Sequence, residues 1–427
     1  MGQRSFPDGN AVRHASADDG GPASEGSDPL RLGGDAAWRA SAAGAALEGS
    51  VSWRSFRGRN GSDEHFILAK TSACGSPARQ VAQLMRSYDE ARQTLGLPPE
   101  SAVFRRFFVG DVGPQHRIVL QSAATDSRSE GPVATSIVRQ PPVGDADMAL
   151  LAYHVDAKTP ITKHRLSPSH IMYEHDGLRH LWSAHLSSRR CSAVAAQTND
   201  IFAQLNSALA LCGGSLLDNC VRTWIYVKDI DQNYKAMVEA RTELFRQAGL
   251  TANTHYIAST GIEGEGVHPN DLVMMDAYSV IGLSPGQVSF LNDFSRLCAT
   301  KDYGVTFERG ARIRYRDRAH CFVSGTASID NRGKIVHEGD VLRQLERVIG
   351  NIEALLGSAK ASLADIMYIL AYVRDPGDSH AVGEFLRKQF PQAPAVILNA
   401  AVCRPGWLVE LECLAISPET VSALPMF

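Results

Sequence analysis

Hydrophobic positions along the chain repeat in the same order three times. Each copy opens with apolar residues three and four apart and closes on a short apolar run that ends in Asp. The copies run from Gln80 to Asp111, from Gln197 to Asp229 and from Gln344 to Asp375. Apolar residues at the first spacing form one face of an α-helix, and the apolar run is typical of a buried strand. The sequence therefore predicts three copies of a helix–strand cassette.

Each cassette extends on both sides into the same larger unit. An apolar strand precedes it, at 65–69, 180–184 and 320–325, and two strands follow it, at 137–140 with 148–155, 256–260 with 272–280, and 396–400 with 408–416. A second helix is predicted in units two and three, and a shorter segment near 115–121 in unit one. The Gly-rich stretch 261–266 is predicted to be a turn between paired strands. The order ββαβαββ predicts an α+β fold with helices on one face of each sheet. The three helix-free faces are then expected to pack against one another in a closed pseudo-threefold core.

The pattern also suggests where the units begin and end. Residues 1–48 are rich in Gly, Ala, Ser and Asp and show no periodicity, so they are predicted to be a disordered tail. The units are predicted to span 49–160, 161–290 and 291–427. A length of 427 residues agrees with three domains at roughly 150 residues each.

Composition narrows the function classes. The net charge is −3 and no basic stripe is visible, which argues against a nucleic-acid partner. No secretory leader and no apolar run of about 18 residues is seen, so neither export nor a membrane span is expected. The eight Cys lack metal-ligand or redox spacing, which predicts reduced thiols in a cytoplasmic protein without a bound metal or other cofactor.

The third unit resembles the RidA (YjgF/YER057c/UK114) superfamily. The residues that carry the resemblance are Val323-Ser324-Gly325, Tyr372-Val373-Arg374-Asp375, Phe390-Pro391, Pro394-Ala395 and Glu410-Leu411-Glu412. It extends more weakly over the other two units and implies a chorismate mutase-like fold. Short members of that superfamily are homotrimers with clefts between subunits. Three units in one chain imply a monomeric pseudo-trimer, or a higher homo-oligomer of it, that binds a small carboxylate substrate.

A narrower resemblance is to the chorismatases, tandem RidA-like enzymes that hydrolyse chorismate. Residues 303–310 are similar to a Tyr-Gly…Phe-Ser-Arg-Ala segment of that family, with Glu308 in place of Ser. Residues 258–262 look like its Ala-Thr-Gly-Ile turn. Cys403 precedes Glu410 by the spacing at which that family places a Cys and a Glu in its catalytic pocket. The resemblance therefore implies that Cys403 and Glu410 belong to the catalytic site.

Glu410 also stands out from the repeat itself. Alternation along 407–414 places Glu410 and Glu412 on the face opposite Trp407, which is expected to pack on helices. Aligned positions are Met274 and Leu150 for Glu410, and Asp276 and Ala152 for Glu412. A solvated strand residue is the ordinary alternative, but apolar residues in the sister units favour a buried position. A buried carboxyl keeps its proton to higher pH and is suited to act as a general acid.

Arginines are the natural partners of a substrate with two carboxylates, because the guanidinium binds them in a bidentate manner. The candidates are Arg309, Arg222 and Arg404, each with surface salt bridging as the alternative. Tyr226, Thr260, Gly261 and Phe307 are expected beside them. Cys403 could instead be a small buried hydrophobe. It is not predicted to be a nucleophile, because the sequence places no His partner for it.

Three functions follow from these residues. The first is a chorismatase-like hydrolase or lyase that releases pyruvate from chorismate or a related cyclic enolpyruvyl acid, leaving a hydroxybenzoate or a dihydrodiol. The second is an imine/enamine deaminase of the RidA type, which holds the substrate carboxylate with an Arg just after the Pro-Ala pair. Val396 occupies that position here and argues against it. The third is a non-catalytic protein that binds small molecules.

Overall fold

The computed structural model describes residues 49–427 except 72–74, 145, 160 and 301–303. The predicted tail, residues 1–48, lies outside the described residues, as does Tyr303 of the chorismatase-like segment. Strands and helices alternate along the described chain and build three mixed sheets.

The first sheet has the strand order β1-β2-β5-β3-β4. Its strands are β1 (Gly49–Phe56), β2 (Ser62–Thr71), β3 (Ala102–Val109), β4 (Ala134–Arg139) and β5 (Met148–Ala157). The helices of this unit are α1 (Pro77–Thr94), the 3-10 helix η1 (Pro99–Ser101) and α2 (Val112–Glu130). The short segment predicted at 115–121 is wrong in length, because α2 has 19 residues. Its second half is mostly polar and small, so helical periodicity of apolar residues fades there.

The second sheet has the order β10-β9-β11-β8-β7-β6. Its strands are β6 (Thr162–Ser167), β7 (His170–His175), β8 (Leu178–Ser187), β9 (Cys220–Val227), β10 (Ala258–Glu263) and β11 (Val273–Ile281), with helices α3 (Val194–Leu211), α4 (Leu216–Asn219) and α5 (Ile230–Gln247). The predicted turn at 261–266 is wrong, because β10 pairs in parallel with β9 and not with β11. The helix α5 carries the chain across from β9 to β10, as parallel neighbours require.

The third sheet has the order β12-β13-β14-β17-β15-β16. Its strands are β12 (Val288–Phe290), β13 (Gly310–Arg314), β14 (Arg318–Ala327), β15 (Ile366–Val373), β16 (Ala395–Asn399) and β17 (Val409–Pro418). The helices are α6 (Val341–Ser358) and α7 (Ser379–Gln389), with the 3-10 helices η3 (Leu363–Asp365) and η4 (Pro376–Asp378). Residues 288–290 pair with β13 and so belong to this sheet, although the sequence assigned them to unit two.

Local signals explain where α1 and α6 begin. The side chain of Asp340 accepts a hydrogen bond from the backbone N–H of Arg343 at 3.1 Å and caps α6. Ser76 caps α1 in the same way, and Pro77 occupies the first helical position, where its missing N–H costs nothing. The apolar face of each helix then rests on its own sheet.

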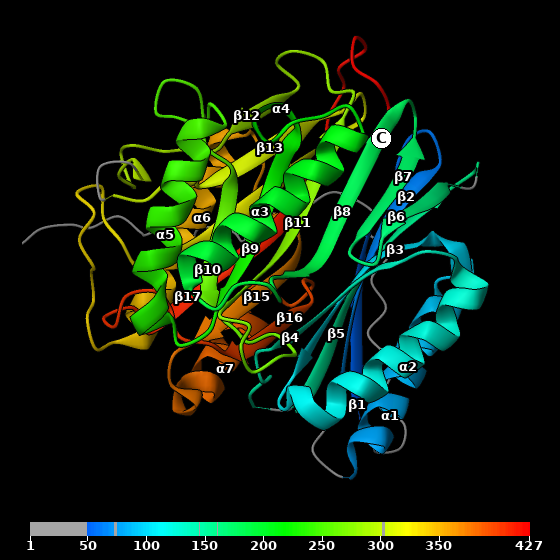
Figure 1. Ribbon diagram of the computed structural model, residues 1–427, viewed down its shortest axis with the longest axis horizontal. Helices are drawn as coiled ribbons and strands as arrows, with labels where there is room; N and C mark the ends of the chain where they lie inside the picture. The colour runs from blue at the N-terminus through cyan, green and yellow to red at the C-terminus, as the bar shows by residue number, and fades with distance from the viewer. Residues whose placement is uncertain (1–48, 72–74, 145, 160, 301–303) are drawn as a thin grey trace, which may run out of the picture. The chain divides into compact units, whose positions relative to one another are not determined.

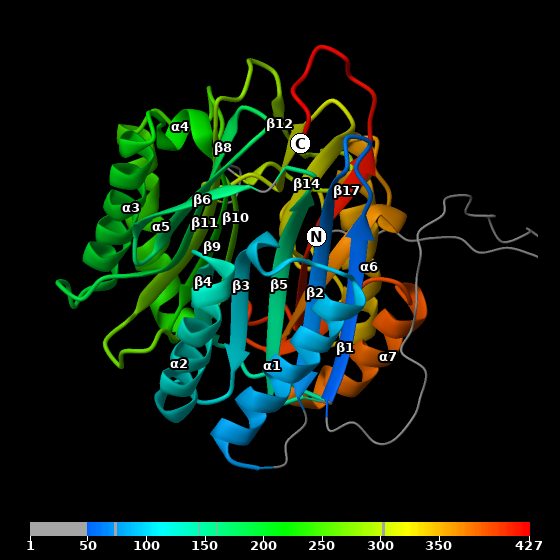
Figure 2. The same cartoon turned by 90° about the vertical axis from the view of Figure 1, so that its right-hand side faces the viewer.

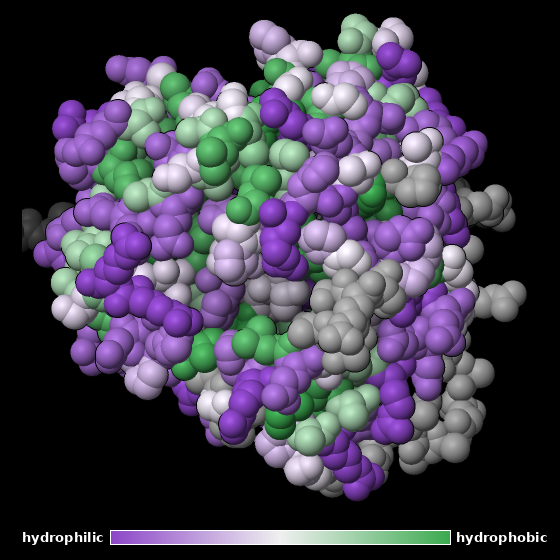
Figure 3. Space-filling model, turned by 45° about the vertical axis from the view of Figure 1, so that its right-hand side comes forward, coloured by the Kyte–Doolittle hydropathy of each residue, from purple (hydrophilic) through white to green (hydrophobic). Residues whose placement is uncertain are grey.

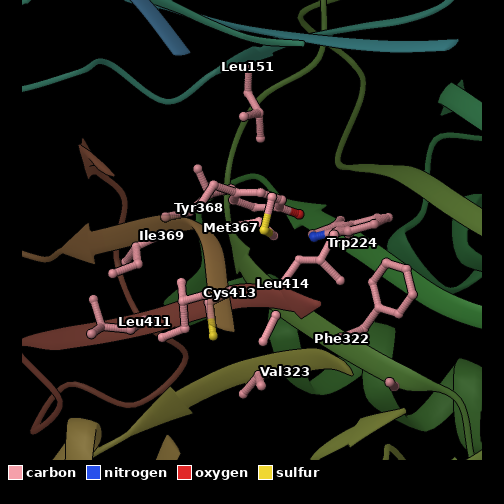
Figure 4. Close-up of a cluster of buried hydrophobic side chains, with 14 of the residues drawn as sticks. Leu151, Trp224, Phe322, Val323, Met367, Tyr368, Ile369, Leu411, Cys413 and Leu414 are labelled. Carbon is pink, nitrogen blue, oxygen red and sulfur yellow. The ribbon is translucent and has the colours of Figure 1, made fainter. Parts of the chain in front are cut away.

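The helix pairs lie outside and the helix-free faces of the sheets lie inside (Figures 1 and 2). One core joins side chains from all three sheets, among them Leu151 of β5, Trp224 of β9 and Tyr368 of β15 (Figure 4). Every residue of β3, β9 and β15, each the second strand from an edge of its sheet, is buried, because both of their faces are covered. The predicted α+β fold with three tandem units is confirmed.

A buried ion pair joins each sheet to the next. Glu412 binds Arg222 at 2.6 Å between the third and second sheets. Arg106 binds Asp276 at 2.9 Å between the first and second, and Arg318 binds Glu64 at 2.7 Å between the third and first. All six side chains are almost fully buried. Each pair therefore ties two units together through charges that water does not screen.

Candidate active site between the second and third sheets

A cavity of about 140 Å³ lies where β10 approaches β14 and β17. It brings together seven of the nine predicted site residues. Two are from β10, two from the segment before β13, and three from β17 and the loop that leads to it: Thr260, Gly261, Phe307, Arg309, Cys403, Arg404 and Glu410. The predicted inter-unit cleft therefore exists, and its lining comes from both neighbouring units.

Glu410 is the buried carboxyl of this cavity. Its side chain is only 5% exposed. Burial, and next the neighbouring Glu412, raise the pKa of Glu410 to about 8, while Arg309 and Arg222 act in the opposite direction. The group therefore carries its proton at neutral pH and is able to donate it.

Glu412 lies two residues further along β17 but serves a different purpose. Its carboxylate accepts hydrogen bonds from Arg222 at 2.6 Å, from Trp224 Nε1 at 2.9 Å and from the Thr260 hydroxyl. Arg222 also donates to Thr260 and to Ser324, and none of its atoms lines the cavity. The prediction that Arg222 contacts substrate is therefore not supported, because the guanidinium already balances a buried carboxylate behind the cavity wall.

A β-bulge makes room for Glu410. The register between β14 and β17 shifts between Val323 and Thr326, so Ser324 and Gly325 together face Glu412. A Cβ atom placed on Gly325 would lie 2.1 Å from Oε1 of Glu410. Only glycine leaves space for the carboxyl at this position.

Two of the predicted arginines border the cavity. Arg309 is 6% exposed, and its Nη2 donates to the Cys298 carbonyl at 3.3 Å while its guanidinium lies 5.5 Å from the ring of Phe307. Arg404 is half-buried and lies 4.9 Å from the ring of Trp407. Aromatic contacts of this kind help to hold a guanidinium in place.

Cys403 lies on the cavity wall, and burial raises the pKa of its thiol to about 12, with the Glu410 charge as the next cause. A thiol with that pKa is protonated at neutral pH and is a poor nucleophile. Trp407 also lines the cavity, although the sequence placed it on the helix side. The alternation did not apply to it, because β17 begins only at Val409.

The helix α5 contributes Tyr234 and Arg241, which sequence reasoning missed as site residues. Both fall on the helical period that predicts α5. Arg241 is 1% exposed. A charged residue in the middle of a helix's apolar face was the available signal, because such a residue is rarely buried without a partner.

Two other residues lie elsewhere. Tyr226 was predicted at the site, but its hydroxyl donates to Asp276 of the same sheet at 3.2 Å, beside the ion pair of Asp276 with Arg106. It is therefore part of an ion-pair network and not of this cavity. Glu308 accepts a hydrogen bond from the Tyr256 N–H at 2.9 Å and lines a neighbouring cavity that shares Arg309. Burial raises the pKa of Glu308.

The pairing of the strands corrects the internal alignment of unit one. On β17, Glu410 pairs with Tyr372, which lies three residues before Asp375. On β11, Met274 pairs with Tyr226, which lies three residues before Asp229. In the first sheet, Ala149 faces Phe108 and Leu151 faces Arg106. Ala149 and Leu151 are therefore the counterparts of Glu410 and Glu412, and the predicted Leu150 and Ala152 are each one residue off. Their side chains point to the helix layer instead.

Other kinds of site are not seen in the described part of the chain. It contains no cluster of three His, Cys, Asp or Glu side chains that could hold a metal ion. None of its helices is long and apolar enough to cross a membrane. Polar side chains cover much of the face in Figure 3, with hydrophobic residues in small groups between them.

Three comparisons place this geometry among known proteins. A family model described as endoribonuclease L-PSP matches residues 313–417. A RutC family protein of Pyrococcus abyssi is 32% identical over 96 residues, which is 22% of this chain and 76% of that protein. The 3-aminoacrylate deaminase RutC of Acinetobacter baylyi is 29% identical over 96 residues, with the same coverage of both chains. A crystal structure of a chorismatase is similar with a TM-score of 0.56 and 18% identity, over 74% of this chain and 93% of that one. This last likeness concerns the fold.

Proposed function

Because the chain belongs to the RidA (YjgF/YER057c/UK114) superfamily, we propose that its Glu410 cavity is the active site of a chorismatase-like hydrolase or lyase. The substrate would be chorismate or a related cyclic enolpyruvyl acid. The observation that carries the proposal is a buried, protonated carboxyl in a cavity bordered by three arginines. An enol ether with two carboxylates needs both features.

Glu410 would supply the proton that starts the reaction. The enolpyruvyl methylene takes the proton and becomes a methyl group, and positive charge develops on the adjacent ether carbon. Water attacks that carbon and gives a hemiketal, which collapses to pyruvate and the ring alcohol. The sum consumes one water and leaves a dihydrodiol. If the ring instead loses its substituent with aromatisation, it becomes a hydroxybenzoate and no water is consumed overall. Glu410 regains its proton from the attacking water or from the ring.

The arginines would hold the two carboxylates. Arg309 and Arg404 border the cavity from different segments, so each is suited to one end of a rigid di-acid. Arg241 on α5 adds a third positive charge to the wall. Arg222 has a supporting role, since it holds the carboxylate of Glu412 in place behind the cavity wall.

Deaminase activity is the second candidate, because one relative is a 3-aminoacrylate deaminase. Strand register argues against it. In the third sheet, Leu370 of β15 pairs with Val396 on one side and with Glu412 on the other. In the second sheet, Trp224 of β9 pairs with Thr260 on one side and with Asp276 on the other. Thr260 is therefore the counterpart of Val396 in the cleft that contains Glu410. The position at which RidA-type deaminases have Arg is therefore occupied by Thr260 in the cleft of Glu410 and by Val396 in unit three. Neither side chain can hold a carboxylate as Arg does.

Pyruvate release from chorismate tests the proposal. The purified full chain is expected to release pyruvate, followed by coupled lactate dehydrogenase, with the ring product identified by chromatography. Glu410→Gln should lower the rate about 10²–10⁴-fold, the usual contribution of a positioned general acid. Glu338→Gln, which changes a carboxyl of the same unit away from the cavity lining, is the matched control and should retain full activity.

The outcomes separate the alternatives. Full activity in Glu410→Gln would exclude Glu410 as the acid. Turnover of 2-aminoacrylate or 3-aminoacrylate without turnover of chorismate would favour the deaminase. Saturable binding of chorismate without turnover would favour a non-catalytic binding protein.

A further inference from the structure

A second cleft lies between the first and second sheets, at the place that corresponds to the Glu410 cavity. β4 lies beside β8 there, as β10 lies beside β14. In the second cleft an isolated β-bridge pairs Arg139 of β4 with Glu265, and in the first another pairs Ile262 of β10 with Val402. The second cleft has a volume of about 620 Å³ and is the larger of the two.

The β-bulge is present in this cleft as well. The register between β8 and β11 shifts so that Ala184 and His185 together face Asp276. His185 is thus the counterpart of Gly325. It has φ of +57°, a left-handed conformation that is uncommon for residues other than glycine. In the first sheet, β2 and β5 pair without a shift. Bulges that re-aim a side chain are frequent beside binding sites, and strained backbone is often found there.

The chemistry of the second cleft differs from that of the first. Met274 replaces Glu410, so this cleft lacks the acid. His116 lies five residues after Asp111, as Tyr234 lies five residues after Asp229, so His116 takes the place of Tyr234. The rings of His116 and His185 are stacked with centroids 6.0 Å apart. The second cleft therefore lacks the carboxyl of the first and contains two imidazole rings that the first does not have.

Positive charge and apolar surface complete the lining. Arg189 and Arg190 follow β8 and are exposed at the rim, while Ile137, Val267 and Leu120 give the cleft an apolar wall. Asp200 is the acidic residue of the lining, and Gln204 donates to it at 3.2 Å. Burial, and next the charge of His185, lower the pKa of His116 to about 4, so this ring is neutral at pH 7. Nδ1 of His185 is buried and has no hydrogen-bond partner among the described residues. A polar group of a ligand would satisfy it.

We infer that this cleft is a second binding site, which takes a small organic carboxylate with a flat apolar body. The carboxylate would lie at the two arginines of the rim, beside the two imidazole rings. The apolar body would lie on Ile137 and Val267, beside the faces of the histidine rings. The site binds without catalysing, because it has no counterpart of Glu410. The inference does not depend on what the Glu410 cavity does.

Histidine NMR on the full chain tests the site directly. The protein is labelled with ¹³C at histidine Cε1, and the His116 and His185 signals are assigned from His116→Gln and His185→Gln. Benzoate is the probe, and benzamide is its neutral match in size and shape. Benzoate is expected to shift both signals saturably at constant pH and ionic strength, whereas benzamide should not. Inorganic phosphate tests whether any small anion suffices.

Variants at the rim link the shifts to the arginines. Arg189→Gln combined with Arg190→Gln should weaken benzoate binding about tenfold, and Arg343→Gln, an exposed arginine on α6, should not. Unchanged melting temperature and unchanged His signals without ligand show that the double variant is folded. Arg190→Gln alone is the second variant if it is not, and should weaken binding to a smaller extent. The inference is overturned if benzoate shifts neither signal, if benzamide shifts them equally, if phosphate binds and benzoate does not, or if the arginine variants bind as the parent does.

Discussion

The two clefts share a scaffold and differ in the side chains that give each its chemistry. In both, the bulge residues face a buried carboxylate, which binds an arginine of the neighbouring sheet: Glu412 with Arg222, and Asp276 with Arg106. Two residues before these carboxylates, on the same face of each strand, Glu410 of one cleft corresponds to Met274 of the other. The carboxylate–arginine pair is thus common to these two clefts, and the second carboxyl is not. Because unit two folds with Met274 at this position, the fold does not require the Glu410 carboxyl, and we attribute it to the chemistry of its cleft.

The strongest way to break this comparison is to remove the shared ion pair. Arg222→Met and Arg106→Met each leave a carboxylate buried without its counter-charge, and each is expected to lower the free energy of unfolding by about 3–5 kcal/mol. Urea denaturation followed by circular dichroism measures both. Arg246→Met, which removes a fully exposed pair with Glu243, should leave the unfolding curve unchanged. Unfolding curves that Arg222→Met and Arg106→Met leave unchanged would contradict a structural role of this ion pair in the two clefts.

A pH series separates Glu410 from the shared elements. Its folded pKa of about 8 lies above the ordinary 4.5, so the folded state keeps a proton that the unfolded chain releases between these values. The contribution of Glu410 to stability is therefore complete below about pH 4.5 and is lost as pH rises through 8. Glu410→Gln cannot titrate, so it should gain stability relative to the parent across this window, by a few kcal/mol at pH 9.

The measurement is the difference in unfolding free energy between parent and Glu410→Gln at pH 5, 7 and 9. Met274→Gln, at the corresponding position of the second cleft, is the control and should give a difference that does not change with pH. The rate of the parent should also fall above about pH 8, as the acid loses its proton. A flat difference for Glu410→Gln would mean that Glu410 is not protonated at neutral pH.

The glycine of the bulge offers a finer test. In Gly325→Ala, the new methyl would lie 2.1 Å from Oε1 of Glu410 and 2.8 Å from its Cδ, so the carboxyl must move. We expect the rate to fall about 10–100-fold, since displacement of a catalytic group by about 1 Å has effects of this size. Gly357→Ala on α6 meets no atom within 4 Å and should keep full activity. An unchanged rate in Gly325→Ala would show that the bulge does not position Glu410.

The repeat explains why so much of the site was predictable from sequence. Comparing three copies singled out Glu410, and the family resemblance placed Cys403, Arg309 and Thr260 near it. Errors arose where the pattern carries no information. The strand 148–155 is apolar on both faces, so its register slipped by one and gave Leu150 in place of Ala149. Tyr234 and Arg241 were hidden, because helical periodicity marks a position as inward-facing without saying whether it meets core or cavity.

Arg222 and Tyr226 show a second limit. Both are on the inward face of β9, as expected, but each is bound to a carboxylate of β17 or β11. Those partners lie 190 and 50 residues away in sequence, so only the assembled sheets reveal them. Sequence placed these side chains on the correct face and could not assign their partners.

Cys403 is expected to give the smallest effect. Its thiol, with a pKa of about 12, stays protonated and makes its contribution through shape. Cys403→Ala should change the rate of pyruvate release less than about tenfold, which is the range of one small side chain in a pocket. The ratio of ring products is the more sensitive measurement, since that side chain borders the same cavity as Glu410. A loss of 10²-fold or more would instead indicate that the thiol attacks the substrate. Cys403→Ser would then separate the two roles, because it should recover part of the rate if the side chain acts only as a spacer.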